Sequence, residues 1–254
     1  MYDKQLVIRR KATLAKYVLV HGAWHDTWCW ERVIPQLRCR GHEVTAVSLP
    51  NHPGAGTLAY ATAIDEAISS PEETTLVAHS ASGLVAPIVA GQRGVRELVL
   101  LAALMALPGY SWLDQVEAEN SAQLTELFRT LEPQVIVDAD GNWTMPPDCA
   151  VKLFYNDCEP IDAASAVQRM RTQNTTILTE AAPSDPPAAV PTRYVLCSRD
   201  QAVSREWAIR TARERFDATI EEFDASHSPF WSRPYDLVEL LTGSRLDTSS
   251  GRTT

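Results

Sequence analysis

The segment Leu76-Val77-Ala78-His79-Ser80-Ala81-Ser82-Gly83 carries the strongest structural signal in the chain. A buried apolar strand runs directly into a serine flanked by small residues, and a helical pattern follows. A serine presented for chemistry sits on a sharp strand-to-helix turn, where crowded backbones require small residues two positions before and after it. Here these are Ala78 and Ser82, which depart from the glycines of G-x-S-x-G. The same pattern also fits a serine that only caps a helix.

Short β-rich runs alternate with longer helical patterns on both sides of this segment. The predicted strands are Tyr17–Val20, Glu43–Leu49, Thr74–Ala78, Glu97–Leu101, Arg193–Cys197 and Thr219–Phe223. The predicted helices are Thr27–Cys39, Leu58–Ser69, Ser82–Gln92, Arg205–Arg215 and Pro234–Leu241. Nearly continuous apolar strands are covered on both faces. The alternation therefore predicts an α/β fold with a doubly wound, mostly parallel sheet.

One interval, residues 106–191, breaks this alternation. It is predicted to hold helices at Ser121–Leu131 and Ala163–Gln173 and a hairpin around Asp140-Gly141. Its large apolar residues indicate a mainly helical cap over the carboxyl edge of the sheet, where open α/β sheets bind ligands. The alternative is an elaboration that only packs on the core. We expect a core of residues 1–105 and 192–254, with 1–14 and 243–254 flexible, and a cap insertion of residues 106–191.

A histidine able to serve Ser80 lies near the end of the chain. In architectures with this turn, the functional residues run serine, acid, histidine in chain order. Only His227 follows Ser80 at any distance, among histidines 21, 25, 42, 52, 79 and 227. It comes after the last predicted strand, where a neutral imidazole can take a proton from the serine hydroxyl. The alternative is a loop histidine without a role.

An acid is expected after the preceding strand, and that strand is followed by Asp200. Its role would be to hold the imidazole tautomer and stabilise the imidazolium. Glu222 and Asp224 are rivals, but they stand so close to His227 in sequence that they are expected to shape its loop. The other place for an acid, after Glu97–Leu101, holds no carboxylate before Asp114.

Two backbone amides are candidates for an oxyanion hole, which needs N–H groups aimed at the developing negative charge. One belongs to Ala81, directly after the serine and at a helix start. The other belongs to Ala23, in the His21-Gly22-Ala23-Trp24 loop after the first core strand. His21 and His25 have a spacing seen in metal sites, but it spans a glycine turn without a third ligand nearby. We therefore expect no metal.

Composition excludes several other classes of protein. The 254 residues are 45% hydrophobic and 22% charged, which excludes a disordered chain. The net charge of −9, without a basic cluster, disfavours nucleic acid or an anionic membrane as a partner. The longest apolar run, Leu98–Leu107, is too short for a membrane span of roughly 20 residues. Five scattered cysteines and no signal-peptide core favour a reducing, cytoplasmic setting.

Together these residues resemble the α/β-hydrolase superfamily. The stretch Val18–His25 followed by Trp28-Cys29-Trp30 is similar to the branch of plant methylesterases, hydroxynitrile lyases and bacterial esterase relatives. The resemblance spans most of residues 15–241, including Leu153-Phe154-Tyr155-Asn156-Asp157-Cys158 and His227-Ser228-Pro229-Phe230. It implies a serine hydrolase with a helical cap and no cofactor. Carried over by position, Ser80 is the nucleophile, His227 the base, Asp200 the acid, and Ala23 and Ala81 the oxyanion donors.

The resemblance also brings a lyase alternative. In plant members that cleave cyanohydrins, a lysine follows the catalytic histidine and a threonine follows the histidine of the first loop. Here these positions hold Ser228 and Gly22, and both changes favour ester hydrolysis. Relatives that cleave carbon–halogen bonds or epoxides use an aspartate nucleophile, which disagrees with Ser80.

We therefore expect a serine hydrolase that cleaves a small, largely apolar carboxylic ester through an acyl-enzyme. A compact apolar substrate pocket is predicted, although some of its residues will belong only to the core: Phe128, Trp143 and Phe154 in the cap, with Trp24 and Met105 near the floor. A hydroxynitrile lyase and a ligand-binding protein with little turnover are the alternatives. The expected partner is a small ester, and a homodimer stays open.

Overall fold

A six-stranded parallel sheet forms the centre of the molecule. The computed structural model describes residues 14–183 and 188–243. The strand order is β2-β1-β3-β4-β7-β8, and every neighbouring pair is parallel. The strands are β1 (Lys16–Val20), β2 (Glu43–Val47), β3 (Thr74–His79), β4 (Glu97–Leu101), β7 (Thr192–Cys197) and β8 (Thr219–Phe223). All six predicted strands are confirmed, with ends within two residues of the prediction.

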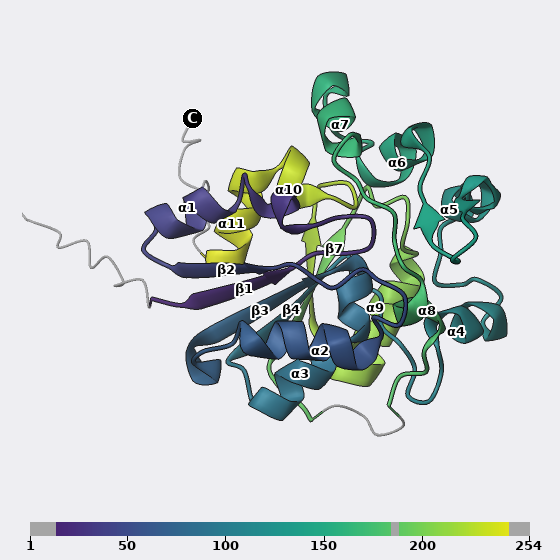
Figure 1. Cartoon of the computed structure of the whole chain (residues 1–254). Helices are drawn as coiled ribbons and strands as arrows, with labels where there is room; N and C mark the ends of the chain where they lie inside the picture. The colour runs from purple at the N-terminus through teal and green to yellow at the C-terminus, as the bar shows by residue number, and fades with distance from the viewer. Residues whose placement is uncertain (1–13, 184–187, 244–254) are drawn as a thin grey trace, which may run out of the picture.

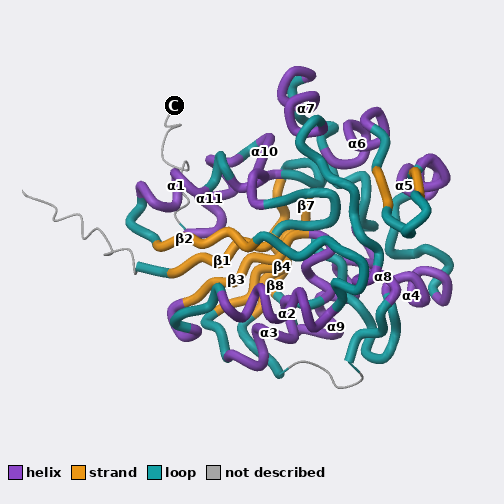
Figure 2. The backbone as a smooth tube through the Cα atoms, viewed as in Figure 1, coloured by secondary structure: helices purple, strands orange, loops and turns teal. Residues whose placement is uncertain are grey.

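Helices cover both faces of this sheet (Figures 1 and 2). Over one face lie α1 (Ile34–Cys39) and α11 (Pro234–Thr242), with the short α10 (Pro229–Ser232) beside them, and over the other lie α2 (Thr57–Glu66), α3 (Ala86–Arg93) and α9 (Arg205–Phe216). All six residues of β3 are buried. The doubly wound α/β fold is confirmed. No helix in the described ranges combines the length and apolarity needed to cross a bilayer.

Prolines divide two of the predicted helices. The pattern over residues 27–39 becomes a 3-10 helix η1 (Thr27–Trp30) followed by α1, which has Pro35 in its first turn. The pattern over residues 82–92 becomes η3 (Ser80–Leu84) followed by α3, which has Pro87 in its first turn. Proline lacks the backbone N–H of a helix interior but fits a first turn, so it starts a new helix. A further 3-10 helix, η2 (Pro71–Glu73), precedes β3.

Residues 106–191, called the insertion below, leave the sheet after β4 and return at β7. The insertion lies past the carboxyl ends of the strands (Figure 1). Its elements are α4 (Trp112–Ala118), α5 (Glu126–Leu131), η4 (Glu132–Gln134), β5 (Ile136–Val137), β6 (Trp143–Thr144), α6 (Pro147–Phe154), α7 (Pro160–Val167) and α8 (Thr176–Thr179). The predicted hairpin is confirmed, because β5 and β6 pair antiparallel around Gly141, whose φ is +75°.

The predicted helix boundaries inside the insertion need correction. The helix expected at residue 121 begins at Glu126, because Asn120 and Ser121 have positive φ and Thr125 caps the later start. The helix expected over residues 163–173 begins earlier, at Pro160, and ends at Val167. The residues that follow leave the helix for contacts with the core.

Two predictions about chain organisation concern the ends of the chain and the insertion. Residues 1–13 and 244–254, which hold nearly all of the predicted flexible ends, lie outside the described residues. The division of the chain into a core and a cap insertion of residues 106–191 stays a prediction.

Candidate active site

The order of the strands brings two distant loops together. The chain runs from β1 outward to β2 and then returns to place β3 on the other side of β1. Val20, the last residue of β1, is paired with Ala78 near the end of β3. Ligands bind at such a reversal in open α/β sheets. The loop that contains Gly22 and Ala23 therefore lies beside the turn that contains Ser80.

The Ser80 turn is strained and tightly packed. Ser80 has a φ of 51°, in the left-handed region that non-glycine residues seldom adopt. A Cβ added to Gly22 would lie 2.6 Å from the Ser80 Cβ, so only glycine allows the first loop to approach this closely. The N–H of Leu104 donates to the Ser80 carbonyl at 2.9 Å. The turn is held from two sides.

Small side chains at the turn fit the crowding that the sequence predicts. Ala78 and Ser82 are both fully buried. The Ser82 hydroxyl lies 2.8 Å from the carbonyl of His79 and 3.2 Å from that of Val20, and can donate to either. Within the turn itself, Gly83 tolerates no side chain, because a Cβ there would lie 2.3 Å from the Leu104 carbonyl oxygen. Alanine and serine therefore take the places of the usual glycines without displacing the turn.

Ser80, His227 and Asp200 form one hydrogen-bonded chain. The Oγ of Ser80 lies 3.0 Å from Nε2 of His227, and Nδ1 of His227 lies 2.8 Å from Oδ2 of Asp200. A carboxylate accepts only, so Nδ1 carries the proton and Nε2 is free to accept one from Ser80. The other oxygen of Asp200 accepts from the backbone N–H groups of Ala202 and Val203, at 2.7 and 3.1 Å. These bonds orient the carboxylate toward the imidazole.

The rival acids lie on the surface. Asp224 forms a two-pronged ion pair with Arg199, with both N···O distances 2.6 Å. Glu222 pairs with Arg205. Both carboxylates are more than half exposed and therefore lie away from the buried His227 ring.

The insertion holds the loop that carries His227. The buried carboxylate of Asp157 accepts from the N–H of Ser226 at 2.9 Å and from the Ser232 hydroxyl at 3.0 Å. The Ser226 hydroxyl donates to the carbonyl of Phe154 at 3.1 Å. Sequence reasoning missed this contact, because no local pattern places Asp157 beside residues 226–232.

The amides of Ala23 and Ala81 both lie at the pocket beside Ser80. Ala81 opens the short helix η3, whose first N–H groups lack partners inside the helix. Within residues 14–183 and 188–243, neither of these N–H groups donates to another protein group. Both are therefore available to an anionic oxygen bound near Ser80.

An apolar pocket opens over Ser80, between the insertion and the core. It encloses about 630 Å³, counting its opening to solvent. Apart from Ser80, His227 and Glu132, its walls are apolar: Ala23, Trp24, Ala81, Leu104, Trp112, Leu113, Val116, Leu124, Phe128, Trp143, Phe154, Leu178, Ala202 and Val203. The structure thus brings Trp24, Phe128, Trp143 and Phe154 together around Ser80, as the sequence predicts.

The placement of Met105 in the pocket is wrong. Its side chain is fully buried in the core, and the neighbouring Leu104 lines the pocket instead. The reason is the hydrogen bond from the Leu104 N–H to the Ser80 carbonyl, which sets Leu104 against the serine turn.

Sequence reasoning also missed the pocket wall made by α4. Trp112, Leu113 and Val116 lie on one side of this helix, at the i, i+1 and i+4 spacing of a single helical face. A signal was present at its start, because Ser111 caps the N–H of Asp114 and the two side chains are 2.7 Å apart. Serine followed three residues later by an acid is a known helix start.

Buried histidines around the site are neutral and fixed as single tautomers. Burial lowers the pKa of His21 to about 4 and that of His25 to about 3. His21 donates from Nδ1 to the Gly22 carbonyl at 2.9 Å and accepts at Nε2 from the Leu49 N–H at 3.1 Å. His25 donates from Nδ1 to the Ala23 carbonyl at 2.7 Å and accepts at Nε2 from the Tyr155 hydroxyl at 2.6 Å. Both rings are therefore committed to structural hydrogen bonds.

No group of three or more His, Cys, Asp or Glu side chains in the described part of the chain is arranged to hold a metal.

Comparisons with known proteins agree with this fold. A model of the alpha/beta hydrolase family matches residues 17–240. Methylesterase 3 of Arabidopsis thaliana is 28% identical over 88% of this chain and 93% of its own length. Methyl jasmonate esterase 1 of Vitis vinifera is 28% identical over 89% and 94%. The crystal structure of a polyneuridine aldehyde esterase mutant superposes with a TM-score of 0.74 and 17% identity, covering 92% of this chain and 100% of that one.

Proposed function

Because the chain belongs to the alpha/beta hydrolase family, we propose that it is a serine esterase that cleaves small, largely apolar carboxylic esters. The observation that carries the proposal is the chain of hydrogen bonds from Ser80 through His227 to Asp200. The similarity to proteins named as methylesterases supports ester hydrolysis.

The reaction would proceed through an acyl-enzyme. Nε2 of His227 takes the hydroxyl proton as Oγ of Ser80 attacks the ester carbonyl. Asp200 keeps the proton on Nδ1 and stabilises the imidazolium that forms. The N–H groups of Ala23 and Ala81 donate hydrogen bonds to the carbonyl oxygen and stabilise the negative charge that develops on it. His227 then protonates the departing alcohol, and water, deprotonated by the same imidazole, releases the acid.

The lining of the pocket favours an uncharged ester that has apolar groups on its acyl side, its alcohol side or both. Its aromatic and aliphatic walls would bury such groups with a gain of about 25 cal/mol per Å² of apolar surface. Glu132 is the one acidic side chain in its lining, and its charge would disfavour substrates that already carry a free carboxylate. The names of the relatives make methyl esters of small acids the first substrates to try.

The proposal includes a reducing, cytoplasmic setting. All five cysteines lie among the described residues and are free. Free thiols persist where disulfides are kept reduced.

The test combines turnover with covalent labelling. Purified protein should cleave p-nitrophenyl acetate or butyrate and react with a fluorophosphonate probe, and Ser80→Ala should abolish both. Ser82→Ala is the matched control, because its hydroxyl is buried against backbone carbonyls, so this variant should still be labelled.

Other outcomes would contradict the proposal. Wild-type protein that neither turns over a broad ester panel nor becomes labelled would favour a ligand-binding role. Cyanide release from mandelonitrile, without ester turnover, would favour a lyase.

A further inference from the structure

The loop that supplies the Ala23 amide is held by the insertion, through Trp24. Trp24 has a φ of 63°, which is strained for a large side chain. Its N–H donates to Oε1 of Gln173 at 3.2 Å, and its carbonyl accepts from the Arg171 N–H at 2.9 Å. Its indole Nε1–H donates to the Trp143 carbonyl at 3.0 Å. Every polar group of Trp24 is thus engaged by the insertion.

The peptide unit that joins Ala23 to Trp24 is fixed at both ends. Its carbonyl accepts from Nδ1 of His25 at 2.7 Å, and its N–H donates to Gln173. A peptide unit is planar, so fixing both ends fixes its plane. The direction of the adjacent Ala23 N–H then depends on the backbone rotations of Ala23 alone.

We propose that Gln173 is a positioning residue that aims the Ala23 N–H at the oxygen that becomes negative during ester cleavage. This inference rests on the proposed function. By binding the Trp24 N–H, Gln173 also keeps that second amide from turning toward the pocket, which leaves the Ala23 amide as the donor of this loop. The insertion would thereby complete the oxyanion hole as well as cover the pocket.

The surroundings of Gln173 hold its side chain in one orientation. Gln173 is 2% exposed, and its Nε2 donates to the Tyr60 hydroxyl at 3.1 Å and to the Asn174 carbonyl at 2.7 Å. With both amide hydrogens engaged, only Oε1 is left to accept from Trp24. Its backbone exchanges two hydrogen bonds with Trp143, each 2.8 Å long. The acceptor is therefore held rigidly, as a positioning role requires.

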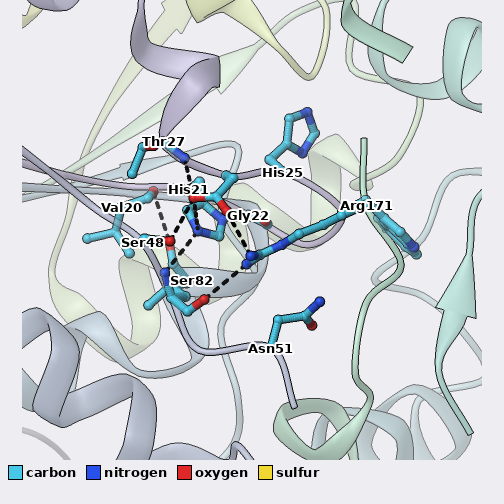
Figure 3. Close-up of polar contacts among 12 residues, drawn as sticks. Val20, His21, Gly22, His25, Thr27, Ser48, Asn51, Ser82 and Arg171 are labelled. Atoms are coloured by element: carbon cyan, nitrogen blue, oxygen red, sulfur yellow. Dashed lines mark hydrogen bonds and ion pairs between the residues drawn. The ribbon is translucent and has the colours of Figure 1, made fainter. Parts of the chain in front are cut away.

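Arg171 fastens the same segment to the core. Its guanidinium lies 2.8 Å from Oδ2 of Asp26 and 3.0 Å from the Leu49 carbonyl. The Asp26 carboxylate also accepts from the N–H of Thr27 and the hydroxyl of Ser48. Figure 3 shows the Arg171 side chain reaching from the insertion into this group of polar residues beside His21 and Gly22. The segment that carries Gln173 is thus tied to the first loop and to the residues that follow β2.

The test compares Gln173→Met with Thr175→Val. Methionine has a similar volume but its sulfur is only a weak acceptor for the Trp24 N–H. Thr175→Val removes a hydroxyl of the same segment that donates to the Gly141 carbonyl, and it leaves the Trp24 bond in place. For Gln173→Met we expect kcat to fall about 10- to 100-fold with KM little changed, somewhat less than the loss of a whole oxyanion donor. Thr175→Val should stay within twofold of wild type.

An inhibitor separates positioning from general destabilisation. A trifluoromethyl ketone forms a hemiketal when Oγ of Ser80 adds to its carbonyl carbon and the hydroxyl proton passes to His227, which places an alkoxide where the oxyanion would lie. Its affinity for Gln173→Met should fall by about the same factor as kcat, and amide hydrogen exchange at residues 21–25 should increase. If this variant does not fold, Gln173→Asn replaces it, because asparagine shortens the side chain by one methylene. We expect the same changes in kcat, inhibitor affinity and hydrogen exchange for Gln173→Asn.

Two failures are distinguishable. Active wild-type protein with unchanged kcat and inhibitor affinity in Gln173→Met, or with equal losses in Thr175→Val, overturns the inference and leaves the proposed function intact. Wild-type protein without ester turnover or labelling overturns both, because no oxyanion forms.

Discussion

At the scale of the residue, the site depends on a strained serine whose neighbours prevent its relaxation. Ser80 keeps a positive φ because Gly22 packs against its Cβ and Leu104 binds its carbonyl. Strain of this kind costs about 1–3 kcal/mol and persists only where surrounding contacts enforce it. In return, Oγ points out of the sheet toward His227 rather than into the core.

Asp200 determines which nitrogen of His227 is free to accept a proton, and a single-atom change tests this. In Asp200→Asn the amide can donate to Nδ1, which would favour the proton on Nε2 and remove the base from Ser80. We expect kcat to fall by about 10²- to 10⁴-fold, by analogy with the same change in serine proteases. Steady-state kinetics on a p-nitrophenyl ester measures the loss.

Asp224→Asn is the matched control. Its carboxylate pairs with Arg199 on the surface, and such exposed pairs contribute little. Its kcat should remain near that of wild type. A larger loss in Asp224→Asn than in Asp200→Asn would show that the acid has been assigned wrongly.

At the scale of the element, the insertion contributes to the site at two points. The segment after α7 holds the first loop through Arg171 and Gln173. The segment after α6 holds the loop that carries His227, through Asp157. The insertion therefore shapes the pocket and also orders loops of the core on both sides of Ser80.

Removing the Asp157 carboxylate tests the second of these points. Asp157→Ala leaves the Ser226 N–H without its acceptor, and a buried unpaired donor costs about 1–3 kcal/mol. We expect the free energy of unfolding to fall by about that amount. We also expect kcat to fall roughly tenfold, because a loosened Ser226 lets the adjacent His227 drift from Ser80. Urea unfolding and steady-state kinetics measure the two effects.

Asp162→Ala is the control from the same part of the insertion. Its carboxylate is 40% exposed and pairs with Arg32, so we expect less than about 1 kcal/mol of destabilisation and no change in kcat. Equal kcat in wild type and Asp157→Ala would argue against a role for Asp157 in placing the base.

At the scale of the whole molecule, the buried neutral histidines make stability depend on pH. Burial lowers the pKa of His21 to about 4 and of His25 to about 3, and it lowers the pKa of His79 well below the ordinary 6.5. In the unfolded chain these residues regain a pKa near 6.5. Between the two values the unfolded state binds protons that the folded state does not, so stability falls as the pH falls.

The expected result is a plateau above about pH 7.5 and a decline that begins near pH 6.5. Each of the three histidines lowers the free energy of unfolding by up to roughly 1.4 kcal/mol per pH unit as the pH falls, until the pKa of that histidine in the folded state is reached. Urea unfolding at pH 8, 6.5 and 5.5 measures the decline. A constant free energy of unfolding from pH 7.5 to 5 would contradict this account.

The strand–helix alternation predicted the fold because strand and helix signals are local. Six apolar runs predicted six strands, and the hairpin at Gly141 followed from its turn residues. Helix ends were predicted less well where a capping side chain or a positive φ decides them, as at Thr125 and Ser121. The helix α4 was missed although its capping serine and acid are visible in the sequence.

By itself, the sequence determined the order of the elements and singled out Ser80, Asp200 and His227, because each follows a strand and parallel strands end at one edge. Only the tertiary structure decided which other residues line the pocket beside these three and which hold the neighbouring loops in place. Leu104 rather than Met105 faces the pocket, and Gln173 reaches Trp24 across 149 residues of chain. Such choices depend on how segments distant in sequence pack against each other, and no local pattern of residues encodes that packing.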